Sequence, residues 1–372
     1  MVARPLLLAF GLVLAACAPT PAAGGRPAQP APPGPPPAAG AASPPAAASP
    51  QRALVRYASQ FSSGDTPMFL AAERGYLQQE GVDLEFVRFG NASEMIPALA
   101  TGQVEAGSAG SNPATWNAVA RGIPLKLVLD RGTFRPGWGD QALVIRKAVY
   151  DARPVQSLAD LRGLTLAATP PGKGTASGCA LAAGLQRVGL TLDDVNLQAI
   201  NFPDMLAALA NGAIDGALLN EPFLARALGQ GTAVRAVDID QMYPNFTISA
   251  VVFGPQLYQQ RDVAKGVVRA YIRGIREFLA ARTGSGGALT NDEIDAIVSK
   301  YTGIEPAFVR EMSPPGFNPN GLPNRDALLY CYQFFRAEGM IPEPASEQAL
   351  AAVWGTDLVE EALAEIGRAP EP

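Results

Sequence analysis

The residues best suited to chemistry in this sequence are small polar and acidic side chains that follow predicted strands. Ser62, Ser63 and Asp65 come after the first apolar strand pattern, and Asn220 and Glu221 follow a later one. Hydroxyl, amide and carboxylate groups can hydrogen-bond a ligand, and a carboxylate in a closed cleft needs a partner. Serine at such a position is equally an ordinary helix N-cap, and Glu221 could instead form an ion pair across its turn. For the serines and for Glu221, the sequence alone therefore does not decide between contact with a ligand and a role in local structure.

Histidine is absent from the sequence, and this absence excludes several kinds of site. Zinc sites built on imidazole, Ser/His/Asp triads and Cys/His nucleophiles all need histidine, which is also the commonest general base. The three cysteines, at positions 17, 179 and 331, are too few and too scattered for a disulfide framework or a cysteine-rich metal site. We therefore expect no catalytic residue, no metal and no cofactor.

Further candidate ligand contacts lie in other loops. Ser108 and Ser111 follow another predicted strand, and Asn91 precedes a predicted helix. Thr175 is the expected cap of a glycine-bracketed helix start, which offers free backbone N–H groups to an anion. The segment 170–175 looks like a phosphate loop, but its glycine and lysine spacing fails that motif.

The loop 132–140 is unusually rich in aromatic residues for a loop. Trp138, flanked by glycines, could stack on a flat ligand, although aromatic residues usually belong to the core. Arg131, just before the loop, could pair with a carboxylate, sulfonate or phosphate, or simply with water. These residues favour a flat organic molecule with a polar or anionic group over bare nitrate.

One structural unit occurs twice and positions these loops. Residues 95–113, MIPALATGQVEAGSAGSNP, are repeated over 205–222 as MLAALANGAIDGALLNEP. Each copy has the pattern of a helix that ends at a glycine, then a short strand, then a loop with a polar residue and a proline that begins the next helix. The repeat predicts two α/β halves.

Strand and helix patterns alternate in both halves, which favours parallel strands with right-handed crossovers. In open parallel sheets the ligand lies beyond the carboxyl ends of the strands. We therefore predict mostly parallel sheets in two lobes that face each other across one ligand cleft. The first lobe is expected to comprise residues 54–146, including a strand at 141–146, together with 248–372, and the second lobe residues 147–247.

The N-terminus predicts export and a lipid anchor. Residues 1–16 have a positive start, a short apolar run and small residues, which is typical of a signal peptide and too short to span a bilayer as a mature helix. The LAAC sequence that ends at Cys17 resembles the bacterial lipoprotein box, which predicts lipidation of Cys17, palmitate included. Ordinary cleavage near Ala16 is the alternative. Residues 17–53 carry this anchor and a Pro- and Ala-rich composition that predicts an extended tether.

The segment 66–84, TPMFLAAERGYLQQEGVDL, resembles the pattern A-x-x-x-G-[YF]-x-x-x-E-G-[LV]-x-[LV] of the solute-binding proteins of nitrate-, sulfonate- and taurine-type ABC transporters. This family is related to the binders of thiamine-pyrimidine precursors. Its G-x-[VI]-[DE] strand is matched at 102–105, its E-P-[FY] turn at 221–223, and its closing helix by TDLVEEAL at 356–363. The resemblance covers 54–363 and rests on the ordered set of motifs.

The resemblance implies a periplasmic-binding-protein-like fold of type II and a lipid-anchored protein on the extracytoplasmic side of the membrane. Such a protein captures a small organic molecule, for example a sulfonate, an aromatic acid, a pyrimidine or a flavin, and delivers it to ABC permease subunits. The alternative is an enzyme of the pyrimidine-precursor-synthase branch, but such relatives consume an active-site histidine and use iron. Enzymes of the menaquinone pathway that resemble this family are cytosolic, whereas this sequence has an export signal. A third possibility is that the chain is the binding lobe of a sensor.

Charge and cysteine positions give two further expectations. The formal charge of −5 gives no reason to bind nucleic acid or an acidic membrane, so we expect contact with the membrane only through the lipid anchor. We also expect the protein to be a monomer. Cys179 and Cys331 fall in predicted helices of different lobes, where a bond would clamp the hinge that binding needs. We therefore predict two reduced, largely buried thiols.

Overall fold

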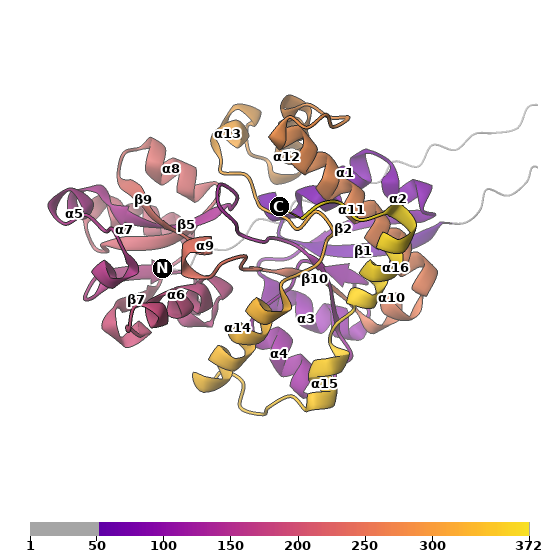
Figure 1. Cartoon of the computed structure of the whole chain (residues 1–372), viewed down its shortest axis with the longest axis horizontal. Helices are drawn as coiled ribbons and strands as arrows, with labels where there is room; N and C mark the ends of the chain where they lie inside the picture. The colour runs from indigo at the N-terminus through magenta and orange to yellow at the C-terminus, as the bar shows by residue number, and fades with distance from the viewer. Residues whose placement is uncertain (1–51, 372) are drawn as a thin grey trace, which may run out of the picture. The chain divides into compact units, whose positions relative to one another are not determined.

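The computed structural model describes residues 52–371, which form two five-stranded sheets covered by helices (Figure 1). This arrangement confirms the predicted α/β fold with two sheets. The expected signal peptide, Cys17 and nearly all of the tether lie outside the described residues. Within residues 52–371, no helix combines the length and the apolarity that crossing a membrane requires.

The first sheet has the strand order β2-β1-β3-β10-β4. Strand β1 pairs in parallel with β2 and β3, whereas β10 runs antiparallel to β3 and β4. The strands are β1 (Ala53–Ser59), β2 (Val82–Arg88), β3 (Ala106–Gly107), β4 (Lys126–Asp130) and β10 (Ala250–Phe253).

The second sheet has the order β7-β6-β8-β5-β9. Its strands are β5 (Gln141–Arg146), β6 (Thr165–Ala168), β7 (Asn196–Ala199), β8 (Gly216–Asn220) and β9 (Ala233–Asp238). Strand β5 pairs antiparallel with β8 and β9, so it belongs to this sheet and not to the first lobe as predicted. Apolar patterning identified the strand, but it carries no information on which sheet the strand joins.

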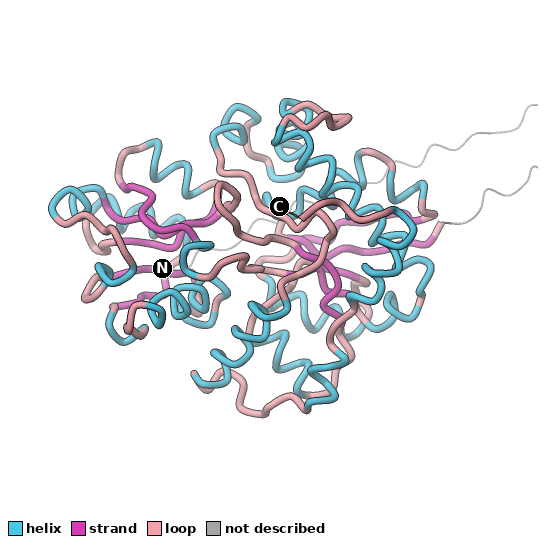
Figure 2. The backbone as a smooth tube through the Cα atoms, viewed as in Figure 1, coloured by secondary structure: helices cyan, strands magenta, loops and turns pink. Residues whose placement is uncertain are grey.

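Both sheets are mixed, but four of the five strands in each run in the same direction, as the predicted mostly parallel sheets require. In each sheet the antiparallel strand is the one that enters from the other sheet: β5 after β4, and β10 after β9. Figure 2 shows the loops, in pink, that run between the two sheets. The chain leaves one sheet at the carboxyl end of a strand. If it enters the facing sheet at the carboxyl ends of that sheet's strands, the strand that it forms there must be antiparallel to its neighbours. The antiparallel strands thus show that the carboxyl ends of the two sheets face each other.

Sixteen helices connect and cover the strands in the described part of the chain. They are α1 (Thr66–Glu73), α2 (Tyr76–Gln79), α3 (Ala92–Thr101), α4 (Pro113–Ala120), α5 (Lys147–Ala152), α6 (Ala176–Arg187), α7 (Phe202–Asn211), α8 (Phe223–Gly229), α9 (Ile239–Met242), α10 (Pro255–Gln259), α11 (Arg261–Thr283), α12 (Asn291–Thr302), α13 (Pro306–Glu311), α14 (Arg325–Ala337), α15 (Glu347–Ala352) and α16 (Thr356–Ile366). The internal repeat is confirmed, because α3 and α7 both end at a left-handed glycine, Gly102 with φ +74° and Gly212 with φ +81°.

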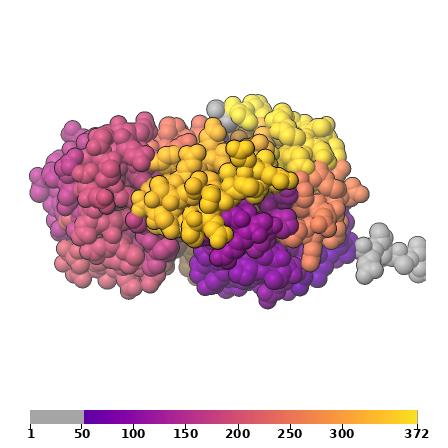
Figure 3. Space-filling view, turned by 90° about the horizontal axis from the view of Figure 1, so that it is seen from below, coloured from indigo at the N-terminus to yellow at the C-terminus, as the bar shows by residue number. Residues whose placement is uncertain are grey.

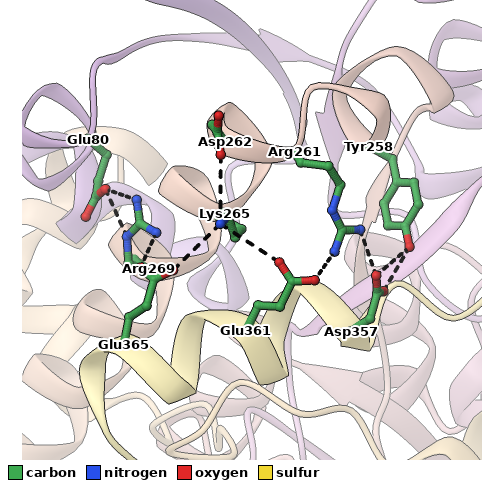
Figure 4. Close-up of polar contacts among 9 residues, drawn as sticks. All are labelled: Glu80, Tyr258, Arg261, Asp262, Lys265, Arg269, Asp357, Glu361 and Glu365. Atoms are coloured by element: carbon green, nitrogen blue, oxygen red, sulfur yellow. Dashed lines mark hydrogen bonds and ion pairs between the residues drawn. The ribbon is translucent and has the colours of Figure 1, made fainter.

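Helix α11 covers the first sheet and is tied to α16 by ion pairs (Figure 4). Its apolar side, which includes Val268, Tyr271 and Ile275, is fully buried. On another side, three cations one turn apart contact carboxylates of α11 itself, α16 and Glu80. The cations are Arg261, Lys265 and Arg269, and the acids are Glu80, Asp262, Asp357, Glu361 and Glu365.

Helix α14 contacts helices from both halves and corrects the cysteine prediction. Cys331 on α14 and Cys179 on α6 form a disulfide, with Cα atoms 5.7 Å apart and both side chains fully buried. The Tyr332 ring packs against Trp116 of α4, with ring centroids 5.1 Å apart. Figure 3 shows the gold residues around α14 lying between the purple first half and the pink second half. The prediction of two reduced thiols is wrong because the helical pattern of α14 does not reveal that it packs on α6.

Candidate functional site

A cavity of about 540 Å³ lies where the carboxyl ends of the two sheets face each other. The first half contributes the loop after β1 and the end of β2, and the second half contributes the start of β5, the end of β8 and the start of α8. The turn after α12 and the residue after α13 complete the lining. Of the predicted site residues, five line this cavity: Ser62, Ser63, Arg131, Asn220 and Glu221.

Arg131 lies at the base of the cavity in a buried ion pair. Its Nε is 3.1 Å from Asp65 Oδ1, and its guanidinium donates a 2.5 Å hydrogen bond to Ser62 Oγ. Asp65 is fully buried and also accepts a 2.7 Å hydrogen bond from Ser59 Oγ. Although burial lowers the pKa of Arg131, the Asp65 carboxylate raises it above its usual value. Arg131 is thus permanently charged and already neutralised by Asp65, which also fixes the Ser62 loop.

Asp140, which the sequence analysis missed, joins the two halves directly. This carboxylate stands just before β5 and accepts a 2.7 Å hydrogen bond from Ser63 Oγ of the first half. Burial raises its pKa, and the nearby Asp65 charge adds to the effect. Its position at the end of the aromatic loop, next to a strand, is the signal that could have identified it.

Glu221 is 4% exposed, and both of its carboxylate oxygens are hydrogen-bonded to backbone N–H groups. Oε1 accepts from Ser313 at 2.7 Å and Oε2 accepts from Ala225 at 3.0 Å. Burial raises the pKa of Glu221, and Asp140 contributes in the same direction. The carboxylate therefore lies in the cavity wall, and each of its oxygens accepts one hydrogen bond from the backbone.

Two exposed arginines line the cavity without an ion-pair partner among residues 52–371. The Arg88 guanidinium lies 3.9 Å from the centroid of the Phe61 ring. The Arg226 guanidinium lies between the Phe223 and Phe308 rings, 5.8 and 5.6 Å from their centroids. Sequence analysis missed both arginines. The available signal was that Arg226 has no acidic residue three or four positions away along its helix.

Asn220 carries a further unsatisfied group at the cavity. Its Oδ1 is buried and has no hydrogen-bond partner in the described part of the chain. Buried polar atoms normally have a partner, so an orphaned acceptor in a cavity lining suits a ligand N–H or O–H donor.

The other predicted site residues lie outside the cavity lining and serve local structure. Asn91 and Thr175 are helix caps that accept N–H groups of Glu94 and Gly178 at 3.1 and 3.0 Å. The remaining four are Asp65, paired with Arg131, Ser108, bonded to the Ala58 carbonyl, Ser111, bonded to the Trp116 indole, and Trp138, whose ring packs edge-on against Phe278 of α11.

Comparison with known proteins gives one family and one shared fold. The family model described as "NMT1/THI5 like" matches residues 63–285. Riboflavin-binding protein RibY of Chloroflexus aurantiacus is 27% identical over 219 residues, so the chain matches little more than half, 58%, of that protein.

Two solved structures share the fold at low sequence identity. The periplasmic aliphatic sulphonate binding protein SsuA of Escherichia coli matches with a TM-score of 0.64 and 21% identity, over 82% of this chain and 92% of SsuA. The desulfurization enzyme DSZB matches with a TM-score of 0.56 and 18% identity, over 85% of this chain and all of DSZB. The fold alone is therefore found with both binding and catalysis.

Proposed function

Because the chain belongs to the NMT1/THI5-like family, we propose that it is a solute-binding protein that captures a small organic molecule and delivers it to the permease of an ABC importer. The observation that carries the proposal is the cavity between the sheets, which takes side chains from both halves and contains two arginines that contact no carboxylate of residues 52–371. A site divided between two halves lets ligand binding bring the halves together.

The proposed ligand is an organic anion with a flat or apolar body. A cavity of about 540 Å³ is far larger than nitrate needs and is in the range of sites for organic molecules. Arg88 and Arg226 provide guanidinium groups for a carboxylate or sulfonate, while Phe61 and Phe223 provide ring surfaces. Riboflavin and sulfonates, named for RibY and SsuA, are therefore the first compounds to test.

We propose Ser62, Ser63, Arg88, Asn220 and Arg226 as the residues nearest the ligand. Asn220 Oδ1 is the acceptor for a ligand donor, since it lacks a partner in residues 52–371. Glycine and serine groups of the 62–64 loop add donors from the first half. Each half thus contributes one guanidinium group and hydrogen-bonding groups that could orient the molecule.

The test of this function is to identify the ligand. Mass spectrometry of small molecules released from the purified protein gives candidates, and a thermal-shift screen of sulfonates, aromatic acids, pyrimidines and flavins gives others. A ligand at about a hundred times its dissociation constant should stabilise the fold by roughly 2.7 kcal/mol. If no small molecule is released and none in the panel shifts the melting temperature, the proposal is wrong.

We also propose that the protein is attached to the membrane through a lipid on Cys17. The LAAC sequence before the Pro- and Ala-rich segment supports this proposal. Replacing Cys17 by Ser should abolish labelling with palmitate and release the protein in soluble form. Unchanged labelling in Cys17→Ser would contradict the anchor without affecting the binding proposal.

A further inference from the structure

We infer that Glu221 is a positioning residue that holds one wall of the cavity against the second half, and not a residue that binds the solute. This inference refines the proposed function, because it concerns how the same cavity is closed. The part of the chain that Glu221 holds is residues 312–316, which we call the latch segment.

Each carboxylate oxygen of Glu221 already accepts one hydrogen bond from the backbone of the protein. Its two oxygens accept from the Ser313 and Ala225 N–H groups at 2.7 and 3.0 Å, and the side chain is buried. Ala225 lies on α8, so the second bond fixes the carboxylate on its own half. The first bond reaches 92 residues along the chain to the latch segment.

The latch segment is bonded along its length to the second half and to the segment that crosses into it. Arg235 of β9 donates a 2.6 Å hydrogen bond to Ser313 Oγ, and the Gly139 N–H donates to the Pro314 carbonyl at 2.9 Å. At the other end, the Thr133 N–H donates to the Gly316 carbonyl at 2.9 Å. A side chain at position 316 would clash with the Thr133 carbonyl, so the two backbones meet only because residue 316 is glycine.

The latch segment contributes to one wall of the cavity, which we define as the lining residues between the end of α12 and the latch segment. Thr302 at the end of α12 and Gly303 and Ile304 after it line the cavity, as does Met312 of the latch segment.

The opposite end of this wall belongs to the first half. Tyr301 on α12 stacks on Phe69 of α1 with ring centroids 4.3 Å apart, and Lys300 pairs with Glu73 at 2.7 Å. The wall is thus anchored on the first half by α12 and attached to the second half through Glu221. If the wall moves with the first half, separating the halves requires the Glu221–Ser313 bond to break together with the Arg235 and Gly139 bonds, so Glu221 is one of the groups that oppose the exit of a bound molecule.

The inference is tested by amide hydrogen exchange of the full-length protein without any ligand. Wild type is compared with Glu221→Gln, Glu221→Ala and a matched control, Glu338→Gln, whose carboxylate pairs with Lys173 away from the cavity. In Glu221→Ala, exchange in peptides covering 305–318 should rise on the order of tenfold, because the Ser313 N–H loses its acceptor. Glu221→Gln should give a smaller rise, since its amide oxygen can still accept one N–H. Peptides from α11 should be unchanged in all variants.

A second measurement separates positioning from a purely structural role. Riboflavin and 1-naphthalenesulfonate are fluorescent, so the dissociation rate of whichever probe binds can be followed in wild type and Glu221→Gln. The dissociation rate should rise about tenfold, with the association rate nearly unchanged, since the wall opens more often. General destabilisation would instead accelerate exchange in α11 as well.

Two results would overturn the inference. Unchanged exchange over 305–318 in Glu221→Ala would show that Glu221 does not hold the latch segment. Loss of probe binding in Glu221→Gln with unchanged exchange would show that Glu221 contacts the solute directly. If neither probe binds the wild type, these two compounds are excluded as ligands, while the exchange result still decides whether Glu221 positions the wall.

Discussion

Two charged regions of this molecule use arginine in opposite ways. On the α11–α16 face, Arg261, Lys265 and Arg269 each contact at least one carboxylate, and several carboxylates are shared (Figure 4). In the cavity, Arg88 and Arg226 lie over aromatic rings and contact no carboxylate of residues 52–371. Both regions are accessible to water, so exposure alone does not explain the difference.

The difference indicates which guanidinium groups still have hydrogen-bond donors available for a ligand. A cation that is already paired gains little from a second anion, whereas an unpaired guanidinium keeps its donors for an incoming group. Paired surface charges hold helices together, whereas Arg88 and Arg226 contact no carboxylate of residues 52–371 and keep their donors for the ligand that we propose. Each of the following predictions tests this division of roles.

The largest effect is expected for removal of Arg88 and Arg226, the two arginines of the cavity lining that contact no carboxylate of residues 52–371. Arg88→Ala with Arg226→Ala should cost about 3–6 kcal/mol of binding free energy, because each hydrogen bond to a charged group contributes about 1.5–3 kcal/mol. Isothermal titration with the tightest-binding compound of the screen measures the loss. The matched double variant, Arg261→Ala with Arg269→Ala, should bind normally. Equal losses in the two double variants would remove the distinction between the regions.

The second effect concerns a buried carboxylate that forms no ion pair within residues 52–371. Asp130, at the end of β4, accepts N–H groups of Gly132 and Asn318 and the Thr133 hydroxyl, at 2.9, 2.6 and 2.9 Å. Burial raises its pKa from 3.8 to about 6 in spite of these bonds. A raised pKa means that the folded protein holds this proton more tightly than the unfolded chain does.

The contribution of Asp130 to stability is therefore fully present below pH 4 and is lost as the pH rises through 6. The shift corresponds to about 3 kcal/mol of unfolding free energy. Urea unfolding between pH 4 and 7 should show this loss in wild type, added to losses from Asp140 and Glu221, whose pKa values are raised in the same direction. Asp130→Asn should flatten the profile by this amount, and an identical slope in the variant would contradict the assignment.

The smallest effect is expected on the paired face. Arg261→Ala removes contacts with Asp357 and Glu361, yet exposed ion pairs contribute only about 0–1 kcal/mol each. Thermal unfolding should show a loss of less than about 1 kcal/mol that shrinks in high salt, because salt screens exposed charges. A loss that is large and independent of salt would show that this face stabilises the protein as strongly as a buried network.

Local sequence patterns predicted the features that depend on neighbouring residues. Gly102 and Gly212 end their helices in the left-handed conformation because glycine alone adopts it without strain. The polar residues at strand ends, such as Ser62 and Asn220, reach the cavity because the carboxyl ends of the strands face each other.

Features that depend on distant residues were not visible in the sequence. Trp138 packs against Phe278, which is 140 positions away, so its loop gave no sign of that contact. Arg88 and Arg226 contact no carboxylate of residues 52–371, and this depends on the positions of residues far away in the sequence, which no local pattern predicts. Cys179 and Cys331 meet because α14 lies on α6, a neighbour relation that neither helix encodes by itself.

The disulfide has a consequence for the integrity of the chain. It closes a covalent ring that spans 152 positions and contains most of the second sheet, α11, α12 and the latch segment. A protease that cuts once within this ring leaves both fragments attached through sulfur. A nicked molecule would therefore run as one band without reductant and as two bands with it, and the halves that form the cavity would stay together after the backbone is broken.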